Sequence, residues 1–319
     1  MYNADVVIIG AGPVGCVLAH KISTELNLSC LIIEKRKHIA GNCYDEKNKK
    51  GVLYHKYGPH YLRFKNKKIF KYLSNFTDWI PGEYSEDFIL SKLGSEIYEK
   101  FYKNYTIKQW GINPRKLSSN IAGRVPIRFN RNPYYVNEKL KFMPKKGFTK
   151  MFEKMISNKK IKLSLNTDFF KIRKKIKYNK FLIYTGTPDK FFNYKYGKLN
   201  WRSLDFKFKT FKKKYIQKSV QYNYPNDYKF TRKVEIKHVT KQKTPYTIIS
   251  KEYPNSNGDP YYPIINNENL NKFNKYKKLI DEIKNQNIFF EGRLAQYKYF
   301  NTDEVIERAL NLFKKINKI

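Results

Sequence analysis

Apolar residues at the start of the chain are spaced as in alternating strands and helices. Residues 4–10 form an apolar run typical of a buried strand, and residues 13–22 have the apolar spacing of an amphipathic helix. A second apolar run at residues 28–34 predicts another strand. The chain therefore begins with a βαβ unit.

The following part is expected to be mostly helical, and the end of the chain to return to strand and helix. After Tyr61 the pattern turns helical. The expected helices are residues 69–73, 88–105, 145–156, a short helix after Thr187, and 303–316 with Asn301 or Thr302 as its cap. The expected strands are residues 160–165, 180–184 and 288–290, and residues 124–142 are expected to be extended.

A β-rich region is expected between residues 201 and 265. Within it, residues 206–215 alternate Phe and Lys, which predicts a half-exposed strand with one apolar and one charged face. Strand–helix alternation on both sides of this region predicts a nucleotide-binding domain interrupted by a substrate domain. We find no internal repeat.

Composition fits a globular protein, with 41% hydrophobic and 29% charged residues. No apolar run is long enough to span a bilayer, and the three cysteines suggest neither a disulfide framework nor a zinc site, so we expect a reducing, cytoplasmic protein. The formal net charge of +38 would suit a nucleic-acid binder. Because the lysines are spread along the whole chain, compositional drift is the better interpretation, and nucleic-acid binding ranks last.

The clearest motif is Gly10-Ala11-Gly12-Pro13-Val14-Gly15, a GxGxxG run between a predicted strand and a predicted helix. Glu34 ends the next predicted strand, where it would accept a hydrogen bond from a ribose hydroxyl. The glycines would let the backbone approach a pyrophosphate at the helix N-terminus. Late in the chain, Gly292-Arg293 before the last helix could place a second helix N-terminus against a flavin ring. FAD held by both ends of the chain therefore fits better than NAD.

A series of longer blocks resembles the UDP-galactopyranose mutase family. The blocks occur in the family's order over nearly the whole chain, and the third and the last are the most specific. They are Ile33-Glu34-Lys35-Arg36 with Gly41-Asn42, His55-Lys56-Tyr57-Gly58-Pro59-His60, Tyr105-Thr106-Ile107-Lys108-Gln109-Trp110-Gly111, Arg124-Val125-Pro126-Ile127-Arg128-Phe129, Trp201-Arg202-Ser203-Leu204-Asp205-Phe206, Thr231-Arg232, Lys251-Glu252-Tyr253, Pro260-Tyr261-Tyr262-Pro263 and Gly292-Arg293-Leu294.

The resemblance implies an α/β fold with three parts. Residues 1–65, 145–200 and 285–319 would form a discontinuous Rossmann-like FAD-binding domain. Residues 66–122 would form an inserted, shortened helical domain. Residues 123–144 and 201–284 would form a substrate domain built on an antiparallel β-sheet.

The resemblance also implies an isomerase that interconverts UDP-galactopyranose and UDP-galactofuranose for cell-surface polysaccharide biosynthesis. In the family, N5 of the reduced flavin is the nucleophile at the anomeric carbon, and UDP leaves and returns. The cofactor therefore does the difficult chemistry, while the protein supplies orientation and positive charge. This explains why the sequence shows no metal cluster, no Ser–His–Asp set and no obvious pair of acid–base carboxylates.

Site residues are assigned from the fingerprint and from the resemblance. The catalytic residues would be Arg124 and Arg232, which clamp the diphosphate, and His60, in the loop against the flavin. The cofactor-binding residues would be Gly10, Gly12, Val14, Gly15, Glu34, Lys35, Asn42, His60, Tyr61, Leu62, Arg293 and Thr302. The substrate-binding residues would be Arg63, Phe101, Tyr102, Tyr105, Trp110, Arg124, Tyr135, Arg202, Arg232, Tyr261 and Tyr299. The residue spacing alone would instead make Tyr98, Phe101, Tyr102 and Tyr105 a core stripe of a helix.

Three departures from the family pattern affect the interpretation. Arg63 stands where the family usually has a second histidine, as in mutases that also accept the N-acetylated sugar, so UDP-N-acetylgalactosamine is a second candidate substrate. Asn301 replaces an acidic residue near the flavin. A segment that the family has between Trp79 and Tyr84 is missing.

Two other functions stay open at this point. One is a flavin oxidoreductase of related fold, such as an amine oxidase. The other is a non-catalytic nucleotide-sugar binder left after the deletion. Whether the chain forms a homodimer and which reductant it uses are not determined by the sequence.

Overall fold

A computed structural model describes residues 2–64, 66–81, 100, 103–113 and 140–318. The predicted βαβ unit is confirmed as β1 (Tyr2–Ile9), α1 (Pro13–Glu25) and β2 (Cys30–Ile33). These strands belong to a five-stranded parallel sheet in the order β15-β9-β1-β2-β8. The other three strands are β8 (Ile161–Ser164), β9 (Ile176–Tyr184) and β15 (Ile288–Phe290), all near predicted positions.

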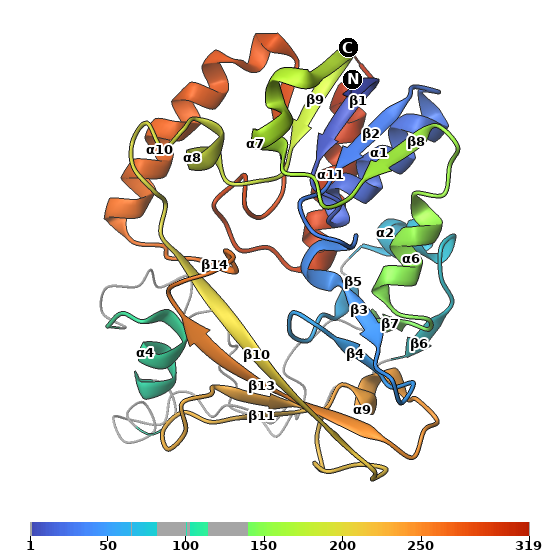
Figure 1. Cartoon of the computed structure of the whole chain (residues 1–319), viewed down its shortest axis with the longest axis vertical. Helices are drawn as coiled ribbons and strands as arrows, with labels where there is room; N and C mark the ends of the chain where they lie inside the picture. The colour runs from blue at the N-terminus through green and yellow to red at the C-terminus, as the bar shows by residue number, and fades with distance from the viewer. Residues whose placement is uncertain (1, 65, 82–99, 101–102, 114–139, 319) are drawn as a thin grey trace.

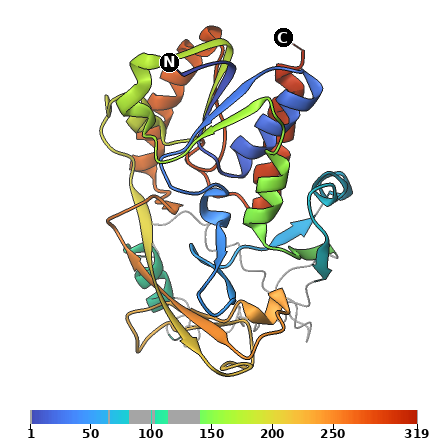
Figure 2. The same ribbon diagram turned by 45° about the vertical axis from the view of Figure 1, so that its right-hand side comes forward.

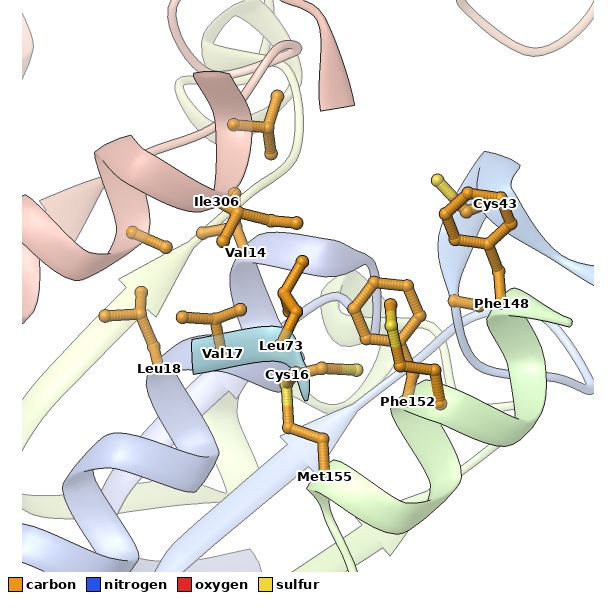
Figure 3. Close-up of a cluster of buried hydrophobic side chains, with 14 of the residues drawn as sticks. Val14, Cys16, Val17, Leu18, Cys43, Leu73, Phe148, Phe152, Met155 and Ile306 are labelled. Carbon is orange, nitrogen blue, oxygen red and sulfur yellow. The ribbon is translucent and has the colours of Figure 1, made fainter. Parts of the chain in front are cut away.

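Both faces of this sheet are buried, as expected for parallel strands. Along β1, Val6 and Ile8 point into one hydrophobic cluster, while Val7 and Ile9 point into another. The first cluster lies under α1, α6 (Phe148–Met155) and α11 (Thr302–Ile316). Figure 3 shows the side chains that join these helices, among them Val14, Val17, Leu18, Phe152, Met155 and Ile306.

The opposite face is covered by α7 (Phe169–Ile172), α8 (Pro188–Phe191) and α10 (Asn267–Glu282). Helix α10 is absent from the sequence-based prediction. It packs beside α8 through the fully buried Tyr276, whose hydroxyl donates to the Gly197 carbonyl at 2.8 Å. The C-terminal helix α11 was predicted, and Asn301 caps it as expected, with the Glu304 carboxylate accepting from the Asn301 N–H at 2.8 Å.

As predicted, the β-rich middle forms an antiparallel sheet, and its strands lie in the order β11-β12-β13-β10-β14. Its strands are β10 (Trp201–Phe211), β11 (Gln221–Asn223), β12 (Arg232–Val234), β13 (Thr247–Asn255) and β14 (Tyr262–Pro263). Strand β10 ends at Phe211, so the alternating pattern continues past the strand itself. The two long strands β10 and β13 cross the lower half of Figure 1, below the parallel sheet.

Smaller elements lie at the side of the two sheets. The helical pattern expected directly after Tyr61 is wrong at its start, because β5 (Leu62–Phe64) precedes helix α2 (Lys67–Ser74). Strand β5 pairs with β7 (Leu140–Pro144), whose other neighbour is β6 (Trp79–Pro81). Of the expected helix 88–105 the structure describes little, and α4 (Asn104–Trp110) contains its last residues.

A hairpin of β3 (Asp45–Lys47) and β4 (Leu53–His55) lies between the two large sheets (Figure 2). Its Tyr54 ring packs 4.9 Å from Phe208 of β10. The Leu53 N–H donates to the side-chain oxygen of Gln242 at 2.6 Å, next to the short helix α9 (Lys237–Thr240). The hairpin thus joins the nucleotide-binding half to the antiparallel sheet. No helix in the described part of the chain could span a bilayer.

Candidate active site

The glycine loop between β1 and α1 has the geometry of a dinucleotide-binding turn. Gly10 has a φ of +107°, a backbone conformation that favours glycine. A Cβ on Gly15 would lie 2.0 Å from the Gly10 carbonyl oxygen, so this glycine lets helix and strand pack closely. Gly12 faces the backbone of Gly41, and a Cβ on Gly41 would lie 3.1 Å from the Gly12 Cα. These two glycines thus form a cradle that is lined at both positions by backbone alone.

Glu34 closes this loop from the end of β2. Its carboxylate accepts from the Ala11 N–H at 2.8 Å and from the Arg36 N–H at 2.9 Å. A carboxylate can accept about four hydrogen bonds, so lone pairs remain for a ribose hydroxyl. Lys35 and Arg36 then pair with Asp259 at 2.7 and 2.8 Å, which ties this segment to the loop before β14.

The C-terminal part of the chain meets the glycine loop. Gly292 lies against Val14, since a Cβ on Gly292 would be 3.3 Å from Val14 Cγ2. Burial raises the pKa of the Cys43 thiol, and the nearby Arg293 and Thr302, at the start of α11, oppose this rise. These contacts bring the predicted cofactor residues of both chain ends together.

His60 approaches the same region from the loop after β4. Its Nδ1 lies 2.9 Å from the Gly58 carbonyl oxygen, and its backbone N–H donates to His55 Nδ1 at 3.1 Å. Burial lowers the pKa of His60 to about 3, and the nearby Arg293 acts in the same direction. The imidazole is therefore neutral at physiological pH.

Arg232 on β12 is the centre of a second group of site residues, the Arg232 cluster, which is separate from the cofactor-side residues around the glycine loop. Its Nε–H donates to the Tyr105 hydroxyl at 2.7 Å, and its Nη1 lies 3.7 Å from Glu252 Oε2. Burial alone would lower the pKa of Arg232, but Tyr105, Glu252 and Tyr262 raise it well above its usual value. The guanidinium thus keeps its charge in a buried place.

A row of aromatic rings leads from this cluster to Arg293. The Trp110 ring lies 5.7 Å from Tyr262, and the Tyr262 ring stacks on Tyr299 at 6.0 Å. The Arg293 guanidinium lies 4.0 Å from the centre of the Tyr299 ring. Arg293 Nε is buried and has no hydrogen-bond partner among the described residues. A continuous row of side chains therefore joins the Arg232 cluster to Arg293 on the predicted cofactor side.

Arg202 holds helix α4, which carries Tyr105 and Trp110. Its guanidinium donates to the carbonyls of Lys108 at 3.1 Å and Gln109 at 3.0 Å, and also to Ser256. The side chain is buried, and burial lowers its pKa. In the described structure these bonds satisfy carbonyls at the C-terminal end of the helix.

Comparison with known proteins gives the family. The family model of UDP-galactopyranose mutase matches residues 100–299, and that of an NAD(P)-binding Rossmann-like domain matches residues 8–76. A probable UDP-galactopyranose mutase of Klebsiella pneumoniae is 31% identical over 97% of this chain and 94% of its own length. The chain belongs to the UDP-galactopyranose mutase family. As a member of this family it is an isomerase.

Two further relatives are also similar over nearly the whole chain. The UDP-galactopyranose mutase of Mycoplasma genitalium is 32% identical over 95% of this chain and 92% of its own length. The dTDP-fucopyranose mutase of Escherichia coli is 27% identical over 98% of this chain and 99% of its own length. The alignment with the Klebsiella protein runs over 365 positions, more than the 319 residues of this chain, so that relative has residues which this chain lacks.

Solved structures agree on the fold. A crystal structure of reduced UDP-galactopyranose mutase matches with a TM-score of 0.79 at 12% identity, over 100% of this chain and 94% of that one. A putrescine oxidase matches with a TM-score of 0.59 at 9% identity, over 99% of both chains. The predicted Rossmann-like domain with an antiparallel β-sheet domain is thereby confirmed.

Several predicted site residues of this mutase-family chain lie away from both the glycine-loop residues and the Arg232 cluster, or lie outside the described residues. Tyr61 and Leu62 pack on the first hydrophobic cluster, and Arg63 lies on β5. Tyr261 is buried near Arg36 and Asp259, with its ring 5.9 Å from Phe206. The predicted site residues outside the described part are Phe101, Tyr102, Arg124 and Tyr135.

Two residues that the sequence analysis did not assign to the site also belong to it. Glu252 is 1% exposed, and neither of its carboxylate oxygens has a hydrogen-bond partner among the described residues. Burial raises its pKa, which the neighbouring Arg232 opposes. Tyr262 lies between Trp110 and Tyr299. The only sequence signal for them was their place inside family-like blocks.

Substituting Arg202 should weaken nucleotide binding in this mutase-family chain without removing the cofactor. In Arg202→Met, two carbonyls of α4 lose a charged donor, so Tyr105 and Trp110 are no longer held in place. Each such hydrogen bond contributes about 1.5–3 kcal/mol, so we expect the Kd of UDP to rise about tenfold or more. Calorimetric titration with UDP checks this, with bound flavin measured by absorbance. An unchanged Kd would show that α4 is held by other contacts.

Proposed function

We propose that the protein binds FAD and, with the flavin reduced, interconverts UDP-galactopyranose and UDP-galactofuranose or their N-acetylated equivalents. The observation that supports this most is the position of Glu252. It lies 3.7 Å from Arg232, and a Cβ on Gly58 in the His60 loop would be 3.4 Å from its Oε1. The carboxylate beside a cationic group suited to a diphosphate therefore also borders the loop assigned to the flavin.

The residues on the cofactor side fit FAD. Gly12 and Gly41 form a backbone-lined cradle next to the N-terminus of α1, where a pyrophosphate would approach the backbone N–H groups. Glu34 has accepting capacity left for a ribose. The buried Arg293 Nε lacks a partner in the described structure, as expected of a donor whose acceptor belongs to a ligand.

The chain's own residues would bind and orient the substrate. When bound, the reduced flavin supplies the nucleophile at N5 for the anomeric carbon. Arg232 would donate to the diphosphate and stabilise the negative charge that grows there as UDP leaves. Trp110 and Tyr105 would contact the uridine, and Tyr299 would donate its hydroxyl to a phosphate. Arg124 and Tyr135 would complete the clamp.

Product chromatography tests this function directly. Dithionite-reduced protein should convert UDP-galactofuranose to the pyranose form, with little conversion by oxidised protein. Reduced protein that binds UDP but converts neither UDP-galactofuranose nor its N-acetylated equivalent would refute the proposal. A dTDP-sugar arm is included because one relative is a dTDP-fucopyranose mutase. Oxygen consumption in the presence of an amine would instead indicate an oxidoreductase.

Arg63 is proposed to set the preference between the two sugars. In Arg63→His, we expect the ratio of kcat/KM for the N-acetylated substrate to that for UDP-galactose to fall about tenfold, a size typical of one altered pocket contact. Competition between the two substrates, followed by chromatography, measures this ratio. Lys68→Ala on the exposed side of α2 serves as a surface control. An unchanged ratio would separate Arg63 from sugar choice.

We place the reaction in the cytoplasm and expect no binding of nucleic acid. All three cysteines, Cys16, Cys30 and Cys43, are free and buried, in agreement with a reducing compartment. The domain limits given above and a homodimeric state stay predictions.

A further inference from the structure

His55 at the end of β4 is a buried histidine that the proposed chemistry does not use. It is 4% exposed, and its Nδ1 accepts a hydrogen bond from the His60 N–H at 3.1 Å. Because Nδ1 accepts, the proton of the neutral ring must be on Nε2. The hydrogen bond therefore fixes the tautomer of His55 and the backbone position of His60.

The other side of the ring faces Asp45. His55 Nε2 lies 3.9 Å from Asp45 Oδ2 and has no hydrogen-bond partner among the described residues. Asp45 itself is held firmly, because its carboxylate accepts from the N–H groups of Phe148 at 2.6 Å and Thr149 at 2.9 Å. These are N–H groups of the first turn of α6, which have no partner within the helix. A fixed negative group thus stands opposite the Nε2–H of His55.

An aromatic ring and a small cavity complete the surroundings of His55. The Phe148 ring packs edge-on at 5.8 Å. Next to His55 lies a cavity of about 10 Å³, the least that a single water needs, bordered by Tyr54, Pro59 and Ser250. Burial lowers the pKa of His55 to about 3, so the ring stays neutral and its Nδ1 can accept.

We propose that His55 is a positioning residue for the flavin loop. Its ring lies between Asp45, which caps the N-terminus of α6, and the backbone N–H of His60, from which it accepts a hydrogen bond, and so it holds residues 58–60 in the orientation that the bound cofactor requires. This rests on the proposed function only in assuming that the loop contacts FAD. Gly58 in the same loop borders Glu252, so a displaced loop would also disturb the Arg232 cluster.

Two amide substitutions separate this role from simple packing. In His55→Asn, the amide oxygen can keep an acceptor near the position of Nδ1. In His55→Gln, the longer side chain places its amide near the position of Nε2, and the acceptor for the His60 N–H is lost. An unsatisfied N–H and a lost hydrogen bond together correspond to about a tenfold effect. For His55→Gln we therefore expect the FAD Kd to rise and kcat to fall about tenfold each with KM little changed, and the visible spectrum of the bound flavin to shift.

The result that supports the proposal is a His55→Asn variant within about twofold of the native protein in all of these measurements. Equal impairment of both variants, or of neither, would overturn it. Should both variants fold poorly, nitrogen NMR of the native holoenzyme decides, because His55 must show the Nε2–H tautomer. Native protein that takes up no FAD would refute the proposed function, whereas native protein that binds FAD, with His55→Gln binding it equally well, overturns the role of His55 alone.

Discussion

Replacing Arg232 with alanine should lower kcat/KM of the reduced enzyme by about a hundred- to a thousandfold, the range seen when one preorganised donor to a developing negative charge is removed. Arg232 carries the buried charge of the second cluster, where Tyr105 holds its Nε at 2.7 Å. Without it, Glu252 would stay buried beside the substrate's diphosphate with no opposing charge from this residue. The measurement is turnover of UDP-galactofuranose after dithionite reduction.

Arg232→Lys is the matched control for charge. Lysine keeps the positive charge but cannot bind Tyr105 and two phosphate oxygens at once, because it lacks the planar fork. We expect it to recover only part of the loss. FAD absorbance, measured in both variants, separates loss of cofactor from loss of turnover, because Glu252 beside Arg232 also borders Gly58 in the His60 loop. Native turnover in the alanine variant would contradict the role of this residue.

The parallel sheet could be predicted because its strands are buried on both faces. In β1 every residue from Val6 to Ile9 enters one of two cores, which leaves an uninterrupted apolar run in the sequence. Helix α10 was missed although Leu270, Phe273, Tyr276 and Ile280 recur at helical spacing. Of its 16 residues only Asn269, Tyr276 and Leu279 are fully buried, and Asn and Lys fill most of the other positions. Its position depends on tertiary contacts such as the Tyr276–Gly197 hydrogen bond.

The candidate site could be predicted where local sequence determines geometry. The glycine loop and Glu34 depend on one βαβ unit, and the structure places them as expected. Glu252 meets Arg232 only through the pairing of β12 with β13, in which these two residues are direct partners. Tyr261 and Tyr262 are neighbours that point to different surroundings, and the short strand β14 offers no periodicity to tell them apart.

Alanine at Gly12 and alanine at Gly15 should have opposite effects on folding and on cofactor binding. Gly12 has a φ of −75°, which alanine adopts readily, and its Cβ would find its nearest neighbour, Gly41 Cα, at 3.9 Å. The Gly12→Ala protein should therefore fold normally. Its methyl group would project into the cradle, where it would displace the pyrophosphate from the backbone N–H groups. Losing one or two charge-assisted hydrogen bonds corresponds to a rise in FAD Kd of about a hundredfold.

Gly15→Ala tests the packing of α1 on β1. The new Cβ would lie 2.0 Å from the Gly10 carbonyl oxygen, which is backbone and cannot turn aside. Overpacking of this kind costs about 3 kcal/mol or more, so this variant should be strongly destabilised even without cofactor. Thermal unfolding of the FAD-free proteins, followed by FAD titration of those that fold, distinguishes the two positions. A Gly12→Ala protein that binds FAD like the native chain would show that the pyrophosphate does not approach this turn, and the cofactor assignment would then fail.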